Sequence, residues 1–180
     1  GSLPVVVKLI ASRKDRRLLG CQVVGPGDCA KRLDVAATAL SFNATIDQLA
    51  MLDLGYAPPF SPPLDPIISA AHMMQNKLDG LALGIGPLEA KNRIDGESRP
   101  VLLDVRGPAE WEEVRLPYDD VVHIPLGALR GRMDELPRDR DILAFCKISL
   151  RGYEAQRILN HAGFDRVAFI RRPAYNPDHY

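Results

Sequence analysis

The feature that most constrains the fold is an alternation of strand and helix patterns that begins at Val101. Strands that alternate with helices build a parallel sheet covered by helices on both faces, with right-handed connections. The predicted strands are Val101–Val105, Val121–Pro125, Ile142–Cys146 and Val167–Ile170, and the predicted helices are Ala109–Glu113, Leu129–Leu136 and Gly152–Ala162. We therefore expect an α/β unit in the second half of the chain.

One strand of this unit delivers a cysteine to a turn. The apolar run 142–145 ends at Cys146, and a helical pattern begins a few residues later. The first N–H groups of a helix have no partners within it, and the helix dipole adds positive potential there. Lys147 and Arg151 add two cations, and such surroundings favour the nucleophilic thiolate. The alternative is a structural role, because free cysteine is among the most buried residue types.

The spacing between the cysteine and the arginine separates two chemistries. Four residues stand between Cys146 and Arg151. Protein-tyrosine-phosphatase-like loops place five residues there and wrap a tetrahedral phosphate. The shorter loop favours one additional sulfur on the cysteine over phosphatase or arsenate-reductase-like chemistry.

Several segments carry a recognisable pattern: Val101–Arg106, Pro108–Trp111, His123–Leu126, Cys146–Tyr153 and Gly163–Phe164. Together they resemble a rhodanese domain. Rhodanese domains carry sulfane sulfur as a cysteine persulfide. The resemblance therefore implies that Cys146 is the carrier, Arg151 its catalytic partner, and Lys147, Ile148, Ser149 and Leu150 the persulfide loop.

Two departures from this pattern keep a second interpretation open. Ser149 stands where relatives usually have glycine, and a serine would be strained there if the position needs a positive φ. The segment 114–119 also replaces the usual Gly-His-Ile-Pro-Gly-Ala sequence. The alternative function is thus a non-catalytic rhodanese-fold module for interaction or regulation.

Asp104 and Arg106 end a predicted strand beside the cysteine loop. We interpret them first as a structural ion pair that supports the loop, with a catalytic role as the alternative. His123 lies in a strand pattern, which favours packing over catalysis.

The first part of the chain has an α+β pattern. A predicted hairpin joins the β-rich runs Val5–Ile10 and Leu18–Val24, and helical spacing follows over Ala30–Phe42. Thr45 and Gln48 fit a capping box. Asp65 followed by Pro66 predicts the start of a helix that runs to about Leu78.

This layout, with Lys8–Ile10, Leu19-Gly20, Val24-Gly25 and the proline-rich Asp53–Ser61, resembles the C-terminal dimerisation domain of flavin-dependent pyridine nucleotide–disulfide oxidoreductases. Coenzyme A disulfide reductases fused to a rhodanese domain have both parts in this order. We therefore expect an incomplete dimerisation domain at 1–80, a linker at 81–99 and a rhodanese domain at 100–180, as a C-terminal fragment of such an enzyme.

The resemblance also implies cofactors and partners. The full-length relatives use FAD, NAD(P)H and coenzyme A, whereas no Gly-x-Gly-x-x-Gly unit is present here, so the fragment is expected to bind none of them. A homodimer through residues 5–78 is expected, with Val5, Val7, Leu9, Tyr56 and Phe60 as exposed apolar candidates. Tyr56 is either a substrate-binding residue that acts in the partner subunit or an aromatic anchor of the interface.

Composition limits the remaining function classes. The formal net charge is zero, which argues against general binding to nucleic acid or anionic membranes. No apolar run approaches the length of a transmembrane helix. The three cysteines do not form a disulfide framework, which favours a reducing cytoplasm. No Cys/His cluster has metal-ligand spacing, so no metal is expected.

Overall fold

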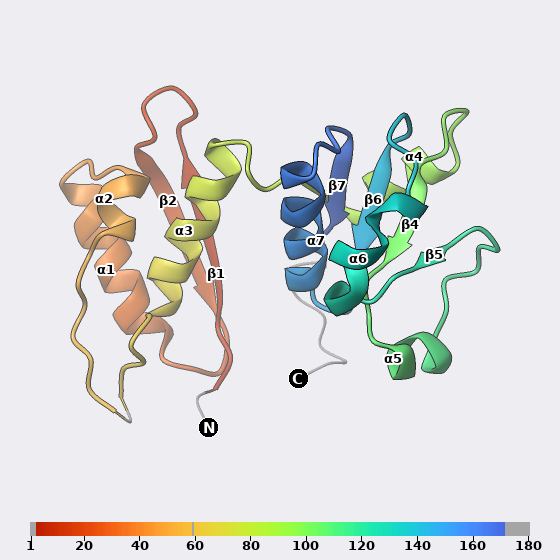
Figure 1. The fold of residues 1–180 in the computed structure, drawn as a ribbon. Helices are drawn as coiled ribbons and strands as arrows, with labels where there is room; N and C mark the ends of the chain where they lie inside the picture. The colour runs from red at the N-terminus through yellow and green to blue at the C-terminus, as the bar shows by residue number, and fades with distance from the viewer. Residues whose placement is uncertain (1–2, 59, 172–180) are drawn as a thin grey trace. The chain divides into compact units, whose positions relative to one another are not determined.

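The computed structural model describes residues 3–58 and 60–171. The chain divides into two compact units, Gly1–Leu81 and Ala82–Tyr180, here called the N-terminal and C-terminal units. Figure 1 shows a strand hairpin packed with helices in the first, and a sheet between helices in the second.

The N-terminal unit is the predicted hairpin with helices packed on it. Its elements are β1 (Val6–Ala11), β2 (Leu18–Val24), α1 (Cys29–Ser41), α2 (Ile46–Ala50) and α3 (Pro66–Leu78). The predicted helix starts are confirmed. Thr45 and Gln48 form the capping box of α2, and the Asp65 side chain accepts the Ile67 N–H at the start of α3. Because each cap satisfies N–H groups that lack helical partners, these starts are set locally.

One residue expected on the surface of this unit lies in its core. Leu9 of β1 is only 8% exposed and packs in one cluster with Ile46, Leu49 and Ile67. Side chains alternate between the two faces of a strand, and Leu9 is on the face that α1 and α3 cover. The prediction that Leu9 contributes to an exposed apolar surface is therefore wrong.

The C-terminal unit is a parallel five-stranded sheet with helices on both faces, as predicted. The strand order is β3-β7-β6-β4-β5. The strands are β3 (Gly84–Ile85), β4 (Val101–Asp104), β5 (Val122–His123), β6 (Ile142–Phe145) and β7 (Val167–Ile170). The helices are α4 (Pro87–Ile94), α5 (Pro108–Glu113), η1 (Leu126–Ala128), α6 (Leu129–Arg132), η2 (Met133–Glu135) and α7 (Leu150–His161).

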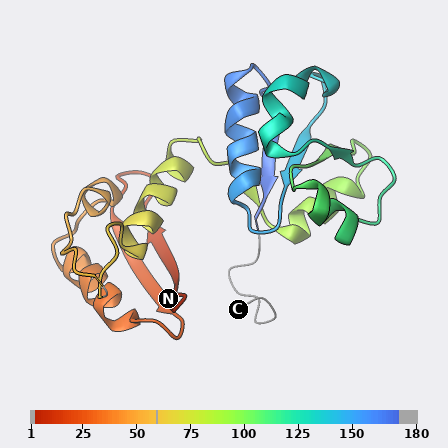
Figure 2. The ribbon, with the colours of Figure 1, turned by 60° about the horizontal axis from the view of Figure 1, so that its bottom comes forward.

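The strand alternation sorts apolar side chains to the two faces of the sheet. Leu103 and Ala144 pack with Leu159 of α7 on one face. Leu102 and Leu143 pack with residues of α4 on the other. Figure 2 shows α7 in blue and α4 in yellow-green on the two sides of the sheet. Strands buried on both faces explain why these runs are almost wholly apolar.

The expected linker over residues 81–99 is largely folded into the C-terminal unit. Gly84 pairs with Phe169 and Ile85 with Ile170, so this short segment is the edge strand β3. Helix α4 then covers the sheet through Ala90 and Ile94. A two-residue strand has no periodicity to read, and it exists because β7 offers an unpaired edge. The boundary between the two compact units accordingly lies between Leu81 and Ala82.

Candidate active site

The site is built at the end of β6. All four residues of this strand are buried, and Cys146 follows at the carboxyl edge of the sheet. Cys146 is half-buried and packs against the core cluster on the α7 side. Residues 147–149 then lead into α7, a helix of 12 residues. The result is the strand–cysteine–helix arrangement that the sequence predicts, and the first N–H groups of α7, which have no helical acceptor, follow Cys146 within a few residues.

A glycine lets α7 lie close to this edge. A Cβ atom on Gly152 would come within 3.3 Å of the Ala144 carbonyl oxygen and 3.4 Å of the Phe169 Cβ. A larger residue would make a contact tighter than is usual, so the neighbouring atoms would have to shift by a few tenths of an ångström. The close packing of this turn therefore favours glycine in the Arg151-Gly152-Tyr153 step.

Ser149 has a positive φ, as its place in the loop suggested. It is the N-cap of α7 with φ 77° and ψ −31°. This is a backbone region that favours glycine and costs other residues roughly 1–3 kcal/mol. The loop keeps the shape that a glycine would give, and the serine is held in it under strain.

Arg151 is held by a carboxylate from another part of the sheet. Its two terminal nitrogens donate to the Glu110 oxygens at 2.6 and 2.8 Å. This pair raises the pKa of the Arg151 guanidinium, and the nearby Cys146 adds to the increase through its charge and a hydrogen bond. Arg151 is thus fixed on one side by Glu110 and lies next to Cys146 on the other.

Glu110 is the site residue that the sequence analysis missed. It stands in the first turn of α5, where its Oε2 also accepts the Gly107 N–H at 3.0 Å. The Arg151 hydrogen bonds are the main cause that lowers the pKa of Glu110 from 4.5 to about 2. Its signal in the sequence was the Gly107-to-Glu110 capping-box spacing, which predicts the helix start but not the distant arginine.

Asp104 and Arg106 form the structural ion pair that the sequence favoured. Asp104 is fully buried at the end of β4, and Arg106 donates to both of its oxygens at 2.7–3.0 Å. Arg106 also donates to the Val114 carbonyl at 2.7 Å. This bond ties the divergent segment 114–119 back to the strand end.

The aromatic residues near this edge pack against one another. His123 Nε2 donates to the Arg106 carbonyl at 3.0 Å, and its ring stacks on Trp111 with a centroid distance of 4.6 Å. His123 therefore has the packing role expected from its strand pattern. The stack joins β5 to α5, the helix that carries Glu110.

The other predicted loop residues lie at the surface. Lys147, Ile148 and Leu150 are exposed around Cys146. Of the two predicted loop cations, Arg151 is the one with an ion pair inside the site.

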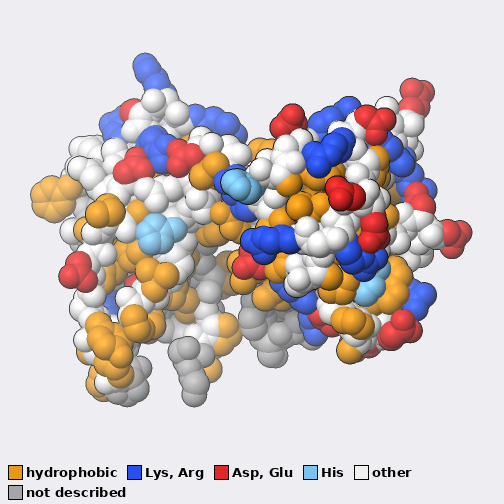
Figure 3. Space-filling model, in the orientation of Figure 1, with side chains coloured by type: hydrophobic (Ala, Val, Ile, Leu, Met, Phe, Trp, Pro, Cys, Tyr) orange, Lys and Arg blue, Asp and Glu red, His pale blue; other side chains and the backbone are white. Residues whose placement is uncertain are grey.

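Tyr56 lies in the N-terminal unit, on the proline-rich segment. It is 62% exposed and Phe60 is 79% exposed. Both line a cavity of about 690 Å³ whose other walls include buried Arg32. Figure 3 shows hydrophobic side chains gathered at the tip of the loop that Figure 1 draws between α2 and α3.

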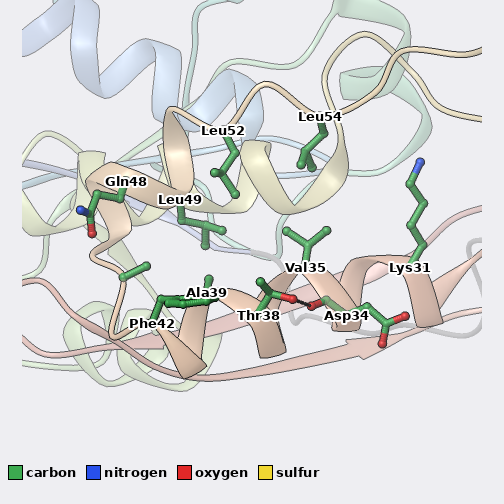
Figure 4. A pocket seen from close by; sticks show the side chains of 11 residues that line it. Lys31, Asp34, Val35, Thr38, Ala39, Phe42, Gln48, Leu49, Leu52 and Leu54 are labelled. Carbon is green, nitrogen blue, oxygen red and sulfur yellow. Dashed lines mark hydrogen bonds between the residues drawn. The ribbon is translucent and has the colours of Figure 1, made fainter.

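A second hollow of the N-terminal unit is strongly apolar. It has a volume of about 730 Å³ and runs between α1 and the segment that follows α2. Figure 4 shows Val35, Leu49, Leu52 and Leu54 turned toward this space from its two sides. Its lining is mainly apolar, so the hollow suits contact with another apolar surface.

No group of three or more His, Cys, Asp or Glu residues in 3–58 and 60–171 is arranged to hold a metal ion. Within the same residues, every helix is too short or too polar to cross a membrane.

Comparison with known proteins agrees with both units. Residues 2–66 match the dimerisation domain of pyridine nucleotide-disulphide oxidoreductases, and residues 87–172 match the rhodanese-like domain family. A sulfurtransferase of Allochromatium vinosum is 34% identical over 89 residues, which cover 44% of this chain and 81% of that protein. The chain belongs to the rhodanese family. The predicted order, a dimerisation domain followed by a rhodanese domain, is confirmed.

Two longer proteins are similar to this chain, one over part of it and one over most of it. The NAD(P)H coenzyme A polysulfide/persulfide reductase of Pyrococcus horikoshii is 39% identical over 75 residues, or 42% of this chain and 17% of that protein. The solved NAD-dependent persulfide reductase from A. fulgidus is 48% identical, with a TM-score of 0.76 over 93% of this chain and 29% of that chain. This rhodanese-family chain thus spans less than a third of either relative.

Proposed function

We propose that the rhodanese unit transfers sulfane sulfur through Cys146. The thiolate attacks the outer sulfur of a persulfide, polysulfide or thiosulfate donor. A bond forms between the two sulfurs, and the donor's own bond to that sulfur breaks. The electron pair leaves with the donor, as a thiolate or as sulfite, and Cys146 becomes a persulfide. Transfer to an acceptor thiol reverses the same exchange.

The observation that carries this proposal is the position of Arg151 between Glu110 and Cys146. A guanidinium fixed beside the sulfur, with the first N–H groups of α7, stabilises anionic sulfur both before and after transfer. The loop of four residues between Cys146 and Arg151 also favours one added sulfur over a phosphate.

Mass spectrometry tests the proposal. Incubation with thiosulfate or polysulfide should add one sulfur mass to the chain, and Cys146→Ser should abolish this addition. Cys29→Ser is the matched control, because Cys29 is a half-exposed thiol of the N-terminal unit, and it should load as the wild type does. Arg151→Ala should load less than Lys147→Ala, since the guanidinium presents a fixed set of donors.

The same measurement separates the alternatives. Unchanged mass with every donor would support the non-catalytic module, which the strained Ser149 favours. Turnover of a phosphate ester would support the phosphatase alternative. Sulfur loading that persists in Cys146→Ser would show that another cysteine carries the sulfur.

We further propose that this chain acts within a persulfide reductase that uses NAD(P)H, as the names of its longer relatives suggest, and FAD, as the resemblance of the N-terminal unit to flavin-dependent oxidoreductases implies. The persulfide on Cys146 would pass its sulfur to coenzyme A or to a redox site that uses FAD and NAD(P)H. Those cofactors would bind outside the residues described here. The three free thiols fit a reducing cytoplasm.

We also propose a homodimer through the N-terminal unit, because this unit matches a dimerisation domain. Tyr56 and Phe60 are exposed apolar side chains, and large exposed apolar patches favour association. Tyr56 would either contact the partner subunit's substrate site or anchor the interface. Light scattering should report a dimer at micromolar concentration, and replacing both residues by Asp should give a monomer. A dimer that survives both replacements would assign the interface elsewhere, for example to the apolar hollow of Figure 4.

A further inference from the structure

Glu110 connects three parts of the rhodanese unit. Its carboxylate accepts the Gly107 N–H at the start of α5 and both terminal nitrogens of Arg151 at the start of α7. Glu110 and Arg151 are 41 residues apart in the chain. The pair is partly buried, with side-chain exposures of 27% and 30%. A charge-assisted, two-point contact of this kind fixes the plane of a guanidinium as well as its position.

We propose that Glu110 is a positioning residue for sulfur transfer: it holds the Arg151 guanidinium in the orientation that stabilises anionic sulfur on Cys146. This inference rests on the proposed sulfur transfer. The contact with Glu110 engages both terminal nitrogens of Arg151, while the remaining guanidinium donors stay available for the sulfur. Preorganised donors stabilise a charge without reorganising during the reaction, which is why their orientation matters.

A second arginine lies near this pair. Arg106 is close enough to both groups that Arg151 lowers its pKa and Glu110 raises it, although Asp104 has the largest effect. Arg106 is itself paired with Asp104, so the ion pair that holds Arg151 is the one with Glu110. Without Glu110, Arg151 would lose the contact that fixes its orientation beside Cys146.

The cap and the ion pair of Glu110 can be separated by substitution. Glu110→Gln keeps the shape and the ability to accept the Gly107 N–H, since the amide oxygen of glutamine is also an acceptor at this position of a helix. It removes the charge that holds Arg151. Glu110→Asp keeps the charge with a shorter reach. If Glu110 acts only as a cap, Glu110→Gln should load sulfur faster than Glu110→Asp. If Glu110 positions Arg151, Glu110→Asp should load sulfur faster than Glu110→Gln.

The test measures the rate of sulfur loading on Cys146 by mass spectrometry, with thiosulfate as donor. We expect a loss of about tenfold for Glu110→Gln and a smaller loss for Glu110→Asp, because charge-assisted hydrogen bonds are about twice as strong as neutral ones. Glu112→Gln is the matched control, since Glu112 lies on the same helix and pairs only with exposed Arg115 among the described residues. This variant should load at the wild-type rate.

A double variant gives the decisive readout. In the Arg151→Ala background, Glu110→Gln should cause little further loss, because the group it positions is already absent. The inference would be overturned if the losses in loading rate of the two single variants multiplied in the double variant. It would also be overturned if Glu110→Gln loaded at the wild-type rate, or faster than Glu110→Asp. Wild-type protein that does not load at all would instead refute the proposed sulfur transfer.

Discussion

The strained position of Ser149 gives a prediction whose size follows from backbone geometry. With φ at 77°, any side chain at this position costs roughly 1–3 kcal/mol that glycine avoids. Glycine costs about 0.5–1 kcal/mol more than other residues in lost freedom on folding. We therefore expect Ser149→Gly to be more stable than Ser149→Ala by about 1 kcal/mol. Comparing these two variants cancels whatever the serine hydroxyl contributes.

Thermal unfolding can be followed for the rhodanese unit alone. The chain has one tryptophan, Trp111, and it lies in this unit. For a domain of about 100 residues, 1 kcal/mol corresponds to about 4–8 °C in Tm. Tryptophan fluorescence should therefore show a higher Tm for Ser149→Gly than for Ser149→Ala by this amount.

A helix position in the same unit provides the control. Glu154 is exposed within α7, where glycine is less stable than alanine by about 1 kcal/mol. At Glu154 the Ala variant should therefore have the higher Tm, the reverse of the order expected at Ser149. If the Ala variant at Ser149 were more stable than the Gly variant by as much as at Glu154, the positive φ would carry no strain and our account of the loop would be wrong.

Three other predictions concern charge and packing. The fold lowers the pKa of Glu110 to about 2, so its ionised form stabilises the rhodanese unit above pH 4.5, and this stability is lost as pH falls toward 2. Urea unfolding followed by fluorescence should show the stability advantage of wild type over Glu110→Gln shrinking between pH 6 and pH 3; a constant advantage would contradict this. Arg32→Met removes the ion-pair partner of the buried Asp65 carboxylate and should lower the free energy of unfolding by about 3–5 kcal/mol, measured by circular dichroism. A loss below about 1 kcal/mol, as is typical of surface ion pairs, would contradict the burial of this pair. Leu103→Ala removes a fully buried side chain and should cost about 2–5 kcal/mol in the same urea assay, with a negligible cost refuting its core position.

The sequence by itself determined the features that depend on neighbouring residues. The capping box at Thr45 and the helix start at Asp65 were predictable because each cap is satisfied within three positions. The buried run 142–145 and the cysteine after it were predictable because a short apolar run followed by a turn is typical of a buried strand. The Cys146-to-Arg151 spacing likewise belongs to one continuous loop.

Tertiary structure alone decided the features that join distant segments. Residues 84–85 become a strand only because β7 presents an edge to them, and Leu9 is buried because two helices cover its side of the hairpin. The pairing of Glu110 with Arg151 could not be read from either local pattern. Each residue fits its own helix start, and only the parallel order of β4 and β6 brings the two helix starts to the same edge of the sheet. Backbone propensity acts over a few residues, whereas sheet pairing and ion pairs act across the fold.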